Sequence, residues 1–215
     1  MSGAAGRIGI VDYGMGNRRS VEKAFEKVGA TPVLTGDPEE LRGVDGLVLP
    51  GVGAFPEAMR RLRASGLDAV VRERAEAGVP VIGLCLGMQL LFEGSAEHEG
   101  ETGLGLLPGR VEPLDAAGMK IPHIGWNTVS WTRSSPLTEG LPDPAAFYHV
   151  HSLAPVPPAG DEDVVLGRGE YGTPFVSFVE RGRVFGAQCH PEKSSTEGLR
   201  LLGNFVRVCT GVTAK

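Results

Sequence analysis

The chain has 215 residues, of which 41% are hydrophobic and 22% are charged, values that suit a globular α/β protein with a proper core. Its 21 basic and 26 acidic residues are well mixed and give a net charge of −5, which argues against a nucleic-acid-binding surface because phosphates require a basic patch. No apolar run approaches the about 20 residues of a membrane span, no signal-peptide pattern is present, and the three cysteines lack disulfide or zinc spacing, so we expect a cytoplasmic protein with reduced thiols and no metal site.

The first part of the chain alternates short apolar strands with helical segments. The expected strands, closed in part by glycine-rich loops, span residues 7–17, 46–55 and 79–84. The expected helices are one that carries Val21, Ala24, Phe25 and Val28 and ends at Gly29, one at 56–77 broken near Gly66, and one from about Gly87. Apolar strands that alternate with helices indicate a parallel sheet buried on both faces.

The character of the sequence changes after about Gly94, where short extended runs are separated by Gly, Pro, Asp and Ser. The clearest strands span residues 147–153, 174–180 and 183–189, and a last helix spans 196–209. We expect these strands to be partly antiparallel and to join the parallel sheet. The predicted fold class is α/β, with a mostly parallel central sheet flanked by helices and additional antiparallel strands, in a single domain over residues 1–215.

Cys85 lies where the strand in "VIGLCLGMQLLF" gives way to a helix. Gly83 and Gly87 flank it in the pattern of a nucleophile elbow, in which glycines relieve the clashes of a strained strand-to-helix turn. The helix start would favour the thiolate, and the Leu86 N–H could bind an oxyanion. The alternative is a thiol that only fills the core, as free cysteines commonly do.

His190 and Glu192 follow an apolar strand in "GAQCHPEKSS". Residues two apart in an extended segment project to the same side, so the pair predicts a general base and a carboxylate that orients it. Without a nucleophile, a surface pair would be the simpler interpretation. Together with Cys85, the pair indicates a Cys-His-Glu triad at the carboxyl ends of strands in one sheet.

A glycine-flanked loop follows another strand in "LPGVGAF", residues 49–55. Such a loop can present backbone N–H groups to an anion, although alone it would indicate only a tight turn. Beside a triad, it predicts the second half of an oxyanion hole.

Six motifs span nearly the whole chain. They are "DYGMGN" (12–17), "LPGVGAF" (49–55), "GLCLGMQLLF" (83–92), "IPHIGWN" (121–127), "HVHS" (149–152) and "HPEKSS" (190–195). In this order they resemble the class I (triad-type) glutamine amidotransferase family, and most closely its glutaminase subunits of imidazole glycerol phosphate synthases. The elbow and the His-Pro-Glu run are shared by the whole class. The features typical of the histidine-pathway group are Met88, Val52 and the run Gly125-Trp126-Asn127.

The resemblance implies hydrolysis of L-glutamine to glutamate and ammonia through a cysteine thioester, with no metal or organic cofactor. It makes Cys85 the nucleophile, His190 the general base and then acid, and Glu192 the residue that orients the imidazole. The oxyanion hole that it implies is formed by backbone groups of Val52, Gly53 and Leu86. The residues that it implies in glutamine binding are Gly51, Gln89 and Ser152.

The resemblance also implies a partner, because the glutaminase module uses up the length of the chain and leaves no room for a barrel. The expected partner is a (β/α)8-barrel cyclase subunit. It would use the ammonia to make imidazole glycerol phosphate and an aminoimidazole carboxamide ribonucleotide in histidine biosynthesis. The residues expected at the interface are Asn17, Pro122, Trp126 and Lys193. A partly buried core position is the alternative for Trp126, although Trp is enriched among interface anchors.

Three other functions remain as alternatives. An ammonia-donating subunit of another pathway would share the triad, but Met88 and the Gly-Trp-Asn run argue against it. A stand-alone cysteine γ-glutamyl hydrolase or peptidase would need an open groove and no partner. A catalytically inactive binding module would not need an intact triad.

The remaining histidines, His98, His123, His149 and His151, have no acidic or thiol neighbours at metal-ligand spacing. His149 and His151 share one side of an expected strand, so we expect one of them to line the site. None is assigned a catalytic role.

Overall fold

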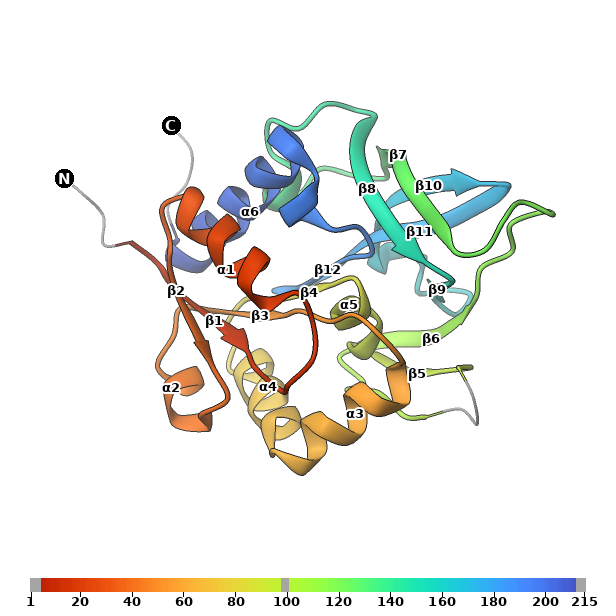
Figure 1. Ribbon diagram of the computed structural model, residues 1–215. Helices are drawn as coiled ribbons and strands as arrows, with labels where there is room; N and C mark the ends of the chain where they lie inside the picture. Colours follow the sequence, from red (N-terminus) through yellow and green to blue (C-terminus); the bar gives the residue numbers. More distant parts are fainter. Residues whose placement is uncertain (1–4, 98–100, 212–215) are drawn as a thin grey trace.

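One large mixed sheet forms the centre of the computed structural model, which describes residues 5–97 and 101–211 (Figure 1). Within these residues the sheet has nine strands in the order β2-β1-β3-β4-β12-β11-β10-β7-β8. Neighbours from β2 to β12 are parallel, and neighbours from β12 to β8 are antiparallel. The strands are β1 (Arg7–Val11), β2 (Thr31–Thr35), β3 (Gly46–Leu49), β4 (Val81–Leu84), β7 (His123–Trp131), β8 (Ala145–His151), β10 (Val165–Tyr171), β11 (Thr173–Arg181) and β12 (Val184–Ala187). The expected α/β class with added antiparallel strands is confirmed.

Helices cover both faces of the sheet. On one face lie α1 (Arg18–Lys27) and α6 (Ser195–Thr210), and on the other lie α2 (Pro38–Arg42), α3 (Phe55–Ala64) and α4 (Leu67–Glu76) (Figure 1). The short α5 (Leu86–Leu90) follows β4 directly. Short 3-10 turns are η1 (Pro136–Thr138), η2 (Glu162–Val164) and η3 (Pro191–Lys193). Among the described residues, no helix is both long enough and apolar enough to cross a membrane.

Alternation along the strands divides the hydrophobic core into two layers. Val48 of β3 points toward α1 and α6 and belongs to the same core layer as Phe25 and Phe205 from those helices. Leu47 and Leu49 point to the opposite face and join the layer formed with α3 and α4. Because helices cover both faces, β3 is buried at every position, which is why its sequence is a continuous apolar run.

The sequence pattern did not indicate β2 or α2. β2 is an edge strand with mostly half-buried side chains, so it lacks the apolar run of a central strand. The five-residue α2 depends on its first turn, where Pro38 occupies the start and the Asp37 carboxylate accepts a hydrogen bond from the Glu39 N–H at 2.8 Å. Neither element therefore carries the periodicity by which longer elements are found.

A second sheet accompanies the first and contains, in the described part of the chain, three strands in the order β5-β6-β9. They are β5 (Phe92–Ser95), β6 (Leu107–Pro113) and β9 (Leu153–Val156). This arrangement corrects the expectation that every strand after Gly94 joins the central sheet. It also corrects the helix expected from Gly87, because α5 ends at Leu90 and β5 begins two residues later.

The pairing of β4 with β12 positions the predicted site. Leu84 and Ala187, the last residues of these parallel strands, are register partners. The Cys85 N–H then donates to the Ala187 carbonyl at 2.7 Å. Cys85 and Gln188 therefore leave the sheet side by side at its carboxyl edge, where ligands bind in open α/β sheets.

The turn at Cys85 requires glycine on both sides. A Cβ atom on Gly87 would overlap the Leu49 carbonyl oxygen, and one on Gly83 would lie 2.5 Å from backbone atoms of Gly87 and Met88. These neighbours are backbone atoms of packed strands and of α5, so displacing them would destabilise the fold. The glycines let α5 lie directly on the ends of β3 and β4.

We expect Gly87→Ala to lower the free energy of unfolding by about 3 kcal/mol or more, because the added methyl group meets backbone rather than a flexible side chain. Gly203→Ala in α6 is the matched control. Its Cβ would have only the Val28 Cβ nearby, at 3.8 Å, and alanine favours a helix by up to about 1 kcal/mol. Urea unfolding of both variants measures the difference, and equal stabilities would contradict this account of the turn.

Candidate active site

A cavity of about 330 Å³ opens beside the carboxyl ends of β4 and β12. Its lining consists of Val52, Gly53, Cys85, Leu86, Gln89, Glu97, Pro122, Val150, His151, Ser152, Leu153 and His190. These residues come from the loop after β3, the Cys85 turn with α5, the segments after β5 and before β7, the junction of β8 with β9, and the segment after β12. Segments far apart in the sequence thus bring the predicted nucleophile and the predicted base to one cavity.

Cys85 occupies a strained turn on the floor of this cavity. Its φ of 53° and ψ of −113° lie outside the regions that a side chain with a Cβ favours, and its exposed fraction is 7%. Its carbonyl accepts hydrogen bonds from the N–H groups of Met88 at 3.1 Å and Gln89 at 3.3 Å, so α5 starts from this residue. Such strain is typical of a nucleophile elbow rather than of a thiol that only fills space.

The Cys85 sulfur has two polar neighbours besides the histidine. Its thiol donates to the Val150 carbonyl at 3.7 Å, and Gln188 Nε2 donates to the sulfur at 3.9 Å. His190 lines the same cavity, and hydrogen bonding and charge attraction between its ring and Cys85 contribute to the raised pKa of His190. The thiol therefore lies beside both the Val150 carbonyl and the imidazole that would take its proton in a triad.

His190 is held at both its backbone and its ring. Its N–H donates to the Tyr148 carbonyl at 2.8 Å, and its Nδ1 donates to Glu192 Oε1 at 2.9 Å. The carboxylate reaches the ring through the 3-10 turn η3, which begins at Pro191, and not through the extended segment expected from the sequence. The bond leaves Nε2, the other ring nitrogen, available for a proton from a nucleophile.

The electrostatics of the pair favour a protonated imidazole. The Glu192 side chain is only 1% exposed, and its Oε2 has no hydrogen-bond partner within the described residues. Burial alone would lower the pKa of His190, but its interactions with Cys85 and Glu192 outweigh burial and raise that pKa to about 9. The ring can therefore take up and hold a proton at neutral pH.

The glycine loop after β3 forms the rim of the cavity. Val52, 43% exposed, and Gly53, with a φ of 111°, line the opening opposite Leu86. Gly51, expected to bind substrate, does not line the cavity. A Cβ atom there would lie 2.7 Å from the Tyr13 hydroxyl and 3.0 Å from the Leu86 Cβ, so Gly51 packs beneath the loop.

Tyr13 fixes the base of this loop. Its buried hydroxyl donates to the Pro50 carbonyl at 2.7 Å. Burial, together with the nearby Cys85, raises the pKa of Tyr13, so the hydroxyl remains a donor. The "DYGMGN" motif therefore supports the loop of the "LPGVGAF" motif from below.

Gln89 and Ser152, the other residues expected to bind glutamine, both line the cavity. Glu97 also lines it, and sequence reasoning missed this residue. The Glu97 carboxylate accepts a hydrogen bond from the Phe55 N–H at 2.7 Å, which holds it near the loop. No local signal distinguishes Glu97 from a surface carboxylate, because it follows β5 in a polar stretch that only the tertiary fold brings to the cavity.

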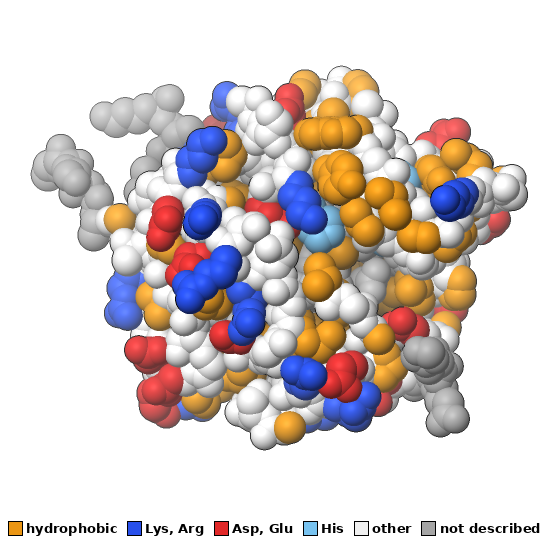
Figure 2. Space-filling model, in the orientation of Figure 1, with side chains coloured by type: hydrophobic (Ala, Val, Ile, Leu, Met, Phe, Trp, Pro, Cys, Tyr) orange, Lys and Arg blue, Asp and Glu red, His pale blue; other side chains and the backbone are white. Residues whose placement is uncertain are grey.

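The residues expected at a partner interface are all at least partly exposed. Trp126 and Ile124 alternate with buried or half-buried positions of β7 and are 55% and 59% exposed. Hydrophobic side chains gather on this face over β7 and β8, beside a histidine (Figure 2). Pro122 and Lys193 are exposed and Asn17 is half-buried, and Pro122 also contributes to the cavity wall.

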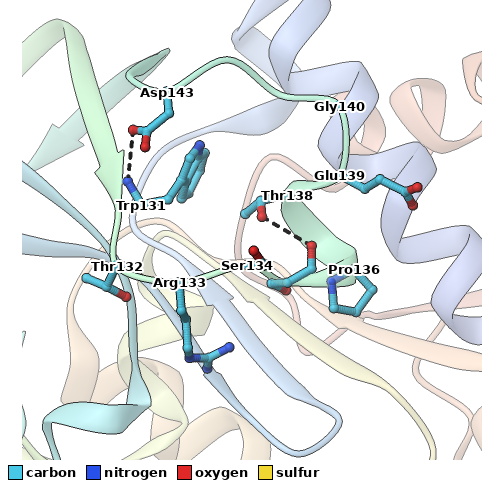
Figure 3. A pocket seen from close by; sticks show the side chains of 10 residues that line it. Trp131, Thr132, Arg133, Ser134, Pro136, Thr138, Glu139, Gly140 and Asp143 are labelled. Carbon is cyan, nitrogen blue, oxygen red and sulfur yellow. Dashed lines mark hydrogen bonds between the residues drawn. The ribbon is translucent and has the colours of Figure 1, made fainter.

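A larger cavity, of about 740 Å³, lies between Trp131 and Asp143 (Figure 3). Its polar groups serve the local fold: Arg133 pairs with Glu180 at 2.8 Å, and the Asp143 carboxylate accepts from the Trp131 N–H at 3.2 Å. It has no cysteine or histidine, so it offers no nucleophile or base like those of the Cys85 cavity. Among the described residues, no cluster of His, Cys, Asp or Glu is arranged to hold a metal ion.

Comparisons with known proteins agree with this geometry. The sequence matches the family described as "Glutamine amidotransferase class-I" over residues 9–209. It is 50% identical over 198 residues to the imidazole glycerol phosphate synthase subunit HisH of Moorella thermoacetica, covering 92% of this chain and 93% of that one. It is 49% identical over 209 residues to the subunit of the same name from Geobacillus kaustophilus, covering 95% and 98%.

Solved structures give the same assignment of the fold. A crystal structure described as a glutamine amidotransferase is 26% identical, with a TM-score of 0.72 over 95% of this chain and 99% of that one. The structure of PurLQS from Thermotoga maritima has a TM-score of 0.76 at 20% identity, over 95% and 99%, a likeness that supports the fold alone.

We expect Glu192→Gln to lower the pKa of His190 from about 9 toward its ordinary value of 6.5, because an amide cannot balance the imidazolium charge. The folded-state pKa is raised, so the pairing stabilises the fold fully below about pH 6.5, and this stabilisation is lost as the pH rises through about 9. The stability difference between the two proteins should therefore be largest below pH 6.5. NMR titration of His190 and unfolding across this range measure both effects, and an unchanged titration would contradict the assignment.

Proposed function

Because the chain belongs to the class I glutamine amidotransferase family, we propose that it is the glutaminase subunit of an imidazole glycerol phosphate synthase, which hydrolyses L-glutamine to glutamate and ammonia. The observation that carries the proposal is the shared cavity of Cys85 and His190, with Glu192 bonded to the far side of the imidazole. A volume of about 330 Å³ suits a single amino acid better than a peptide. The relatives at about 50% identity carry the name of this subunit.

The first half of the proposed reaction forms a thioester. His190 Nε2 accepts the proton of the Cys85 thiol, and the sulfur attacks the side-chain amide carbon of glutamine. The carbonyl oxygen becomes an oxyanion, which would be stabilised by backbone N–H groups at Leu86 and in the Val52–Gly53 loop. His190 returns the proton to the amide nitrogen, the carbon–nitrogen bond breaks, and ammonia leaves.

The second half hydrolyses the thioester. His190 accepts a proton from water, whose oxygen attacks the thioester carbon through a second oxyanion in the same hole. The carbon–sulfur bond breaks, glutamate is released, and the proton returns to the Cys85 sulfur. Glu192 keeps the imidazole in one tautomer and stabilises the imidazolium in both halves. Every step is completed by these side chains and water.

The substrate's amino-acid end would lie on the opposite wall of the cavity. We assign its contacts to Gln89 and to the backbone near Ser152, as expected from the sequence. We add Glu97, because it is the one carboxylate among the described cavity-lining residues and would pair with the α-ammonium group. The role of Gly51 is to allow close packing beneath the loop rather than to touch glutamine.

The proposed partner is a (β/α)8-barrel cyclase subunit that receives the ammonia. It would make imidazole glycerol phosphate and an aminoimidazole carboxamide ribonucleotide in histidine biosynthesis, in the cytoplasm. The exposed hydrophobic face of β7 next to the cavity opening supports this docking site, since ammonia released there would enter the partner directly. Trp126 would act as the central anchor, with Asn17, Pro122 and Lys193 around it.

Cys85→Ala should reduce ammonia release from glutamine by at least about 10⁴-fold, since it removes the atom that forms the thioester. Cys209→Ala is the matched control, because this half-buried thiol of α6 is absent from the cavity lining. Ammonia release by both variants, measured with the cyclase present, tests the mechanism. Equal rates for wild type and Cys85→Ala would refute it.

Trp126→Ala should weaken binding of the barrel cyclase by at least tenfold, because a truncated anchor loses its buried area at the interface. Val156→Ala alters a residue of β9 that is similarly exposed, at 54%, and should leave the affinity unchanged. Titration calorimetry gives both affinities, and glutaminase assays with and without the cyclase and its nucleotide show whether docking stimulates ammonia release. Unchanged binding by Trp126→Ala, or equal rates in all assays, would favour a stand-alone hydrolase.

A further inference from the structure

Three buried histidines outside the triad pack together beside the cavity. They are His123 of β7 and His149 and His151 of β8. His123 and His151 are register partners on these antiparallel strands, and His151 lines the cavity together with Cys85 and His190. His98 lies outside the described residues. Since buried polar groups are normally hydrogen-bonded, the contacts of each ring nitrogen indicate what the cluster holds in place.

The hydrogen bonds of His151 fix its tautomer. Its Nδ1 lies 2.9 Å from the Leu153 carbonyl oxygen, which can only accept, so Nδ1 carries the proton. Burial lowers the pKa of His151 to about 4, so the ring is neutral at pH 7 and Nε2 is an acceptor. His149 is fixed in the same way, because its Nδ1 donates to the Phe147 carbonyl at 3.1 Å and its Nε2 accepts from the Ser177 hydroxyl at 2.8 Å.

His123 is the donor to His151. The distance from His123 Nδ1 to His151 Nε2 is 2.9 Å, and only His123 has a proton to give in this pair. The Nε2 of His123 is then an acceptor, 3.4 Å from Asn127 Nδ2, which also donates to the Glu170 carbonyl at 2.8 Å. Every bond in the chain therefore has one direction, from Asn127 through His123 and His151 to the Leu153 carbonyl.

The chain ends on the wall of the cavity. The Leu153 carbonyl accepts from His151 Nδ1 and also from Gln89 Nε2, at 3.3 Å. Gln89 Nε2 donates in addition to Gln188 Oε1 at 3.0 Å. Two donors occupy the carbonyl oxygen, so the Leu153 peptide cannot turn without leaving a buried donor unpaired. Leu153 and Gln89 both line the cavity, and their positions thus depend on His151.

His123 has a second, separable role in packing. Its ring stacks on Tyr171, with centroids 4.1 Å apart, and meets the edge of Phe175 at 5.6 Å. A phenylalanine could keep these ring contacts but could not donate a hydrogen bond. An asparagine could donate from nearly the position of Nδ1 but could not stack.

We propose that His123 is a positioning residue for glutamine binding: its Nδ1–H holds His151, and through it the Leu153 carbonyl and Gln89, in the arrangement that receives the substrate's amino-acid end. This role rests on the function proposed for the cavity. His123 is not part of the cavity lining and acts only through His151. The chain reaches the triad only indirectly, through Gln89 and then Gln188, which donates to the Cys85 sulfur at 3.9 Å. Loss of the His123 bond therefore affects substrate binding more than the chemical steps.

The test compares His123→Phe with His123→Asn. His123→Phe keeps the stacking and should raise the KM for glutamine about five- to tenfold, with kcat changed less than about twofold, as expected for one lost buried hydrogen bond. His123→Asn should keep the KM within about twofold of wild type while lowering the melting temperature more than His123→Phe does. Val129→Ala, at a buried position further along β7 outside the chain of hydrogen bonds, is the control for general destabilisation of this strand.

NMR of the histidine ring nitrogens tests the hydrogen bond between His123 and His151 directly. In the wild type we expect protonated Nδ1 and unprotonated, hydrogen-bonded Nε2 in His123 and His151, and we expect the His151 Nε2 signal to move in His123→Phe but not in His123→Asn. The positioning role would be overturned by a wild-type KM in His123→Phe, by an equally impaired His123→Asn, or by a His151 protonated at Nε2. In each of these cases, ammonia release by the wild type would leave the proposed function intact. Absence of ammonia release from the wild type with its cyclase would overturn both.

Discussion

The parallel pairing of β4 with β12 is the constraint on which the rest of the site depends. Both strands end at the same edge of the sheet, and their register places the residue after Leu84 against the residue after Ala187. The thiol therefore comes directly from a strand end, while the imidazole follows β12 by three residues and is held by the bond from its N–H to the Tyr148 carbonyl. Such anchoring keeps the reacting groups of a site in fixed relative positions. The flanking glycines serve this pairing, because they allow α5 to lie on the strand ends.

The carboxylate of Glu192 influences the protonation of His190 because it is buried. A buried carboxylate is costly unless its charge is balanced, and within the described residues its polar partner is the His190 ring. Interactions with Cys85 and with this carboxylate raise the pKa of His190 and favour a proton on the imidazole. The neighbouring histidines show the opposite case. His149 and His151 are buried without a carboxylate partner among the described residues, and burial lowers their pKa values to about 3 and about 4. One fold thus holds two kinds of buried imidazole, distinguished by the thiol and the carboxylate that lie beside His190.

The sequence was informative where local pattern and tertiary role coincide. The apolar run of β3, the helical spacing of α1, and the break at Gly66, which has a φ of 69° between α3 and α4, were all predictable. The motif around Cys85 was predictable because its glycines are required by the turn itself. The second sheet and Glu97 were not, since strand partners and cavity walls are set by contacts between distant segments. The chain of hydrogen-bonded histidines was not predictable, because it depends on which ring nitrogen faces which acceptor atom. Spacing along the sequence carries no such information.

Cys85 and Gln188 meet across a gap of 103 residues, and the strands between them include the whole antiparallel half of the sheet. Closing so long a loop is slow compared with forming the local helices and hairpins. During synthesis, the half that carries Cys85 emerges well before the segment that carries His190. A partly made chain would thus hold a thiol without an imidazole, and ammonia could be liberated only after the last strand has been inserted between β4 and β11.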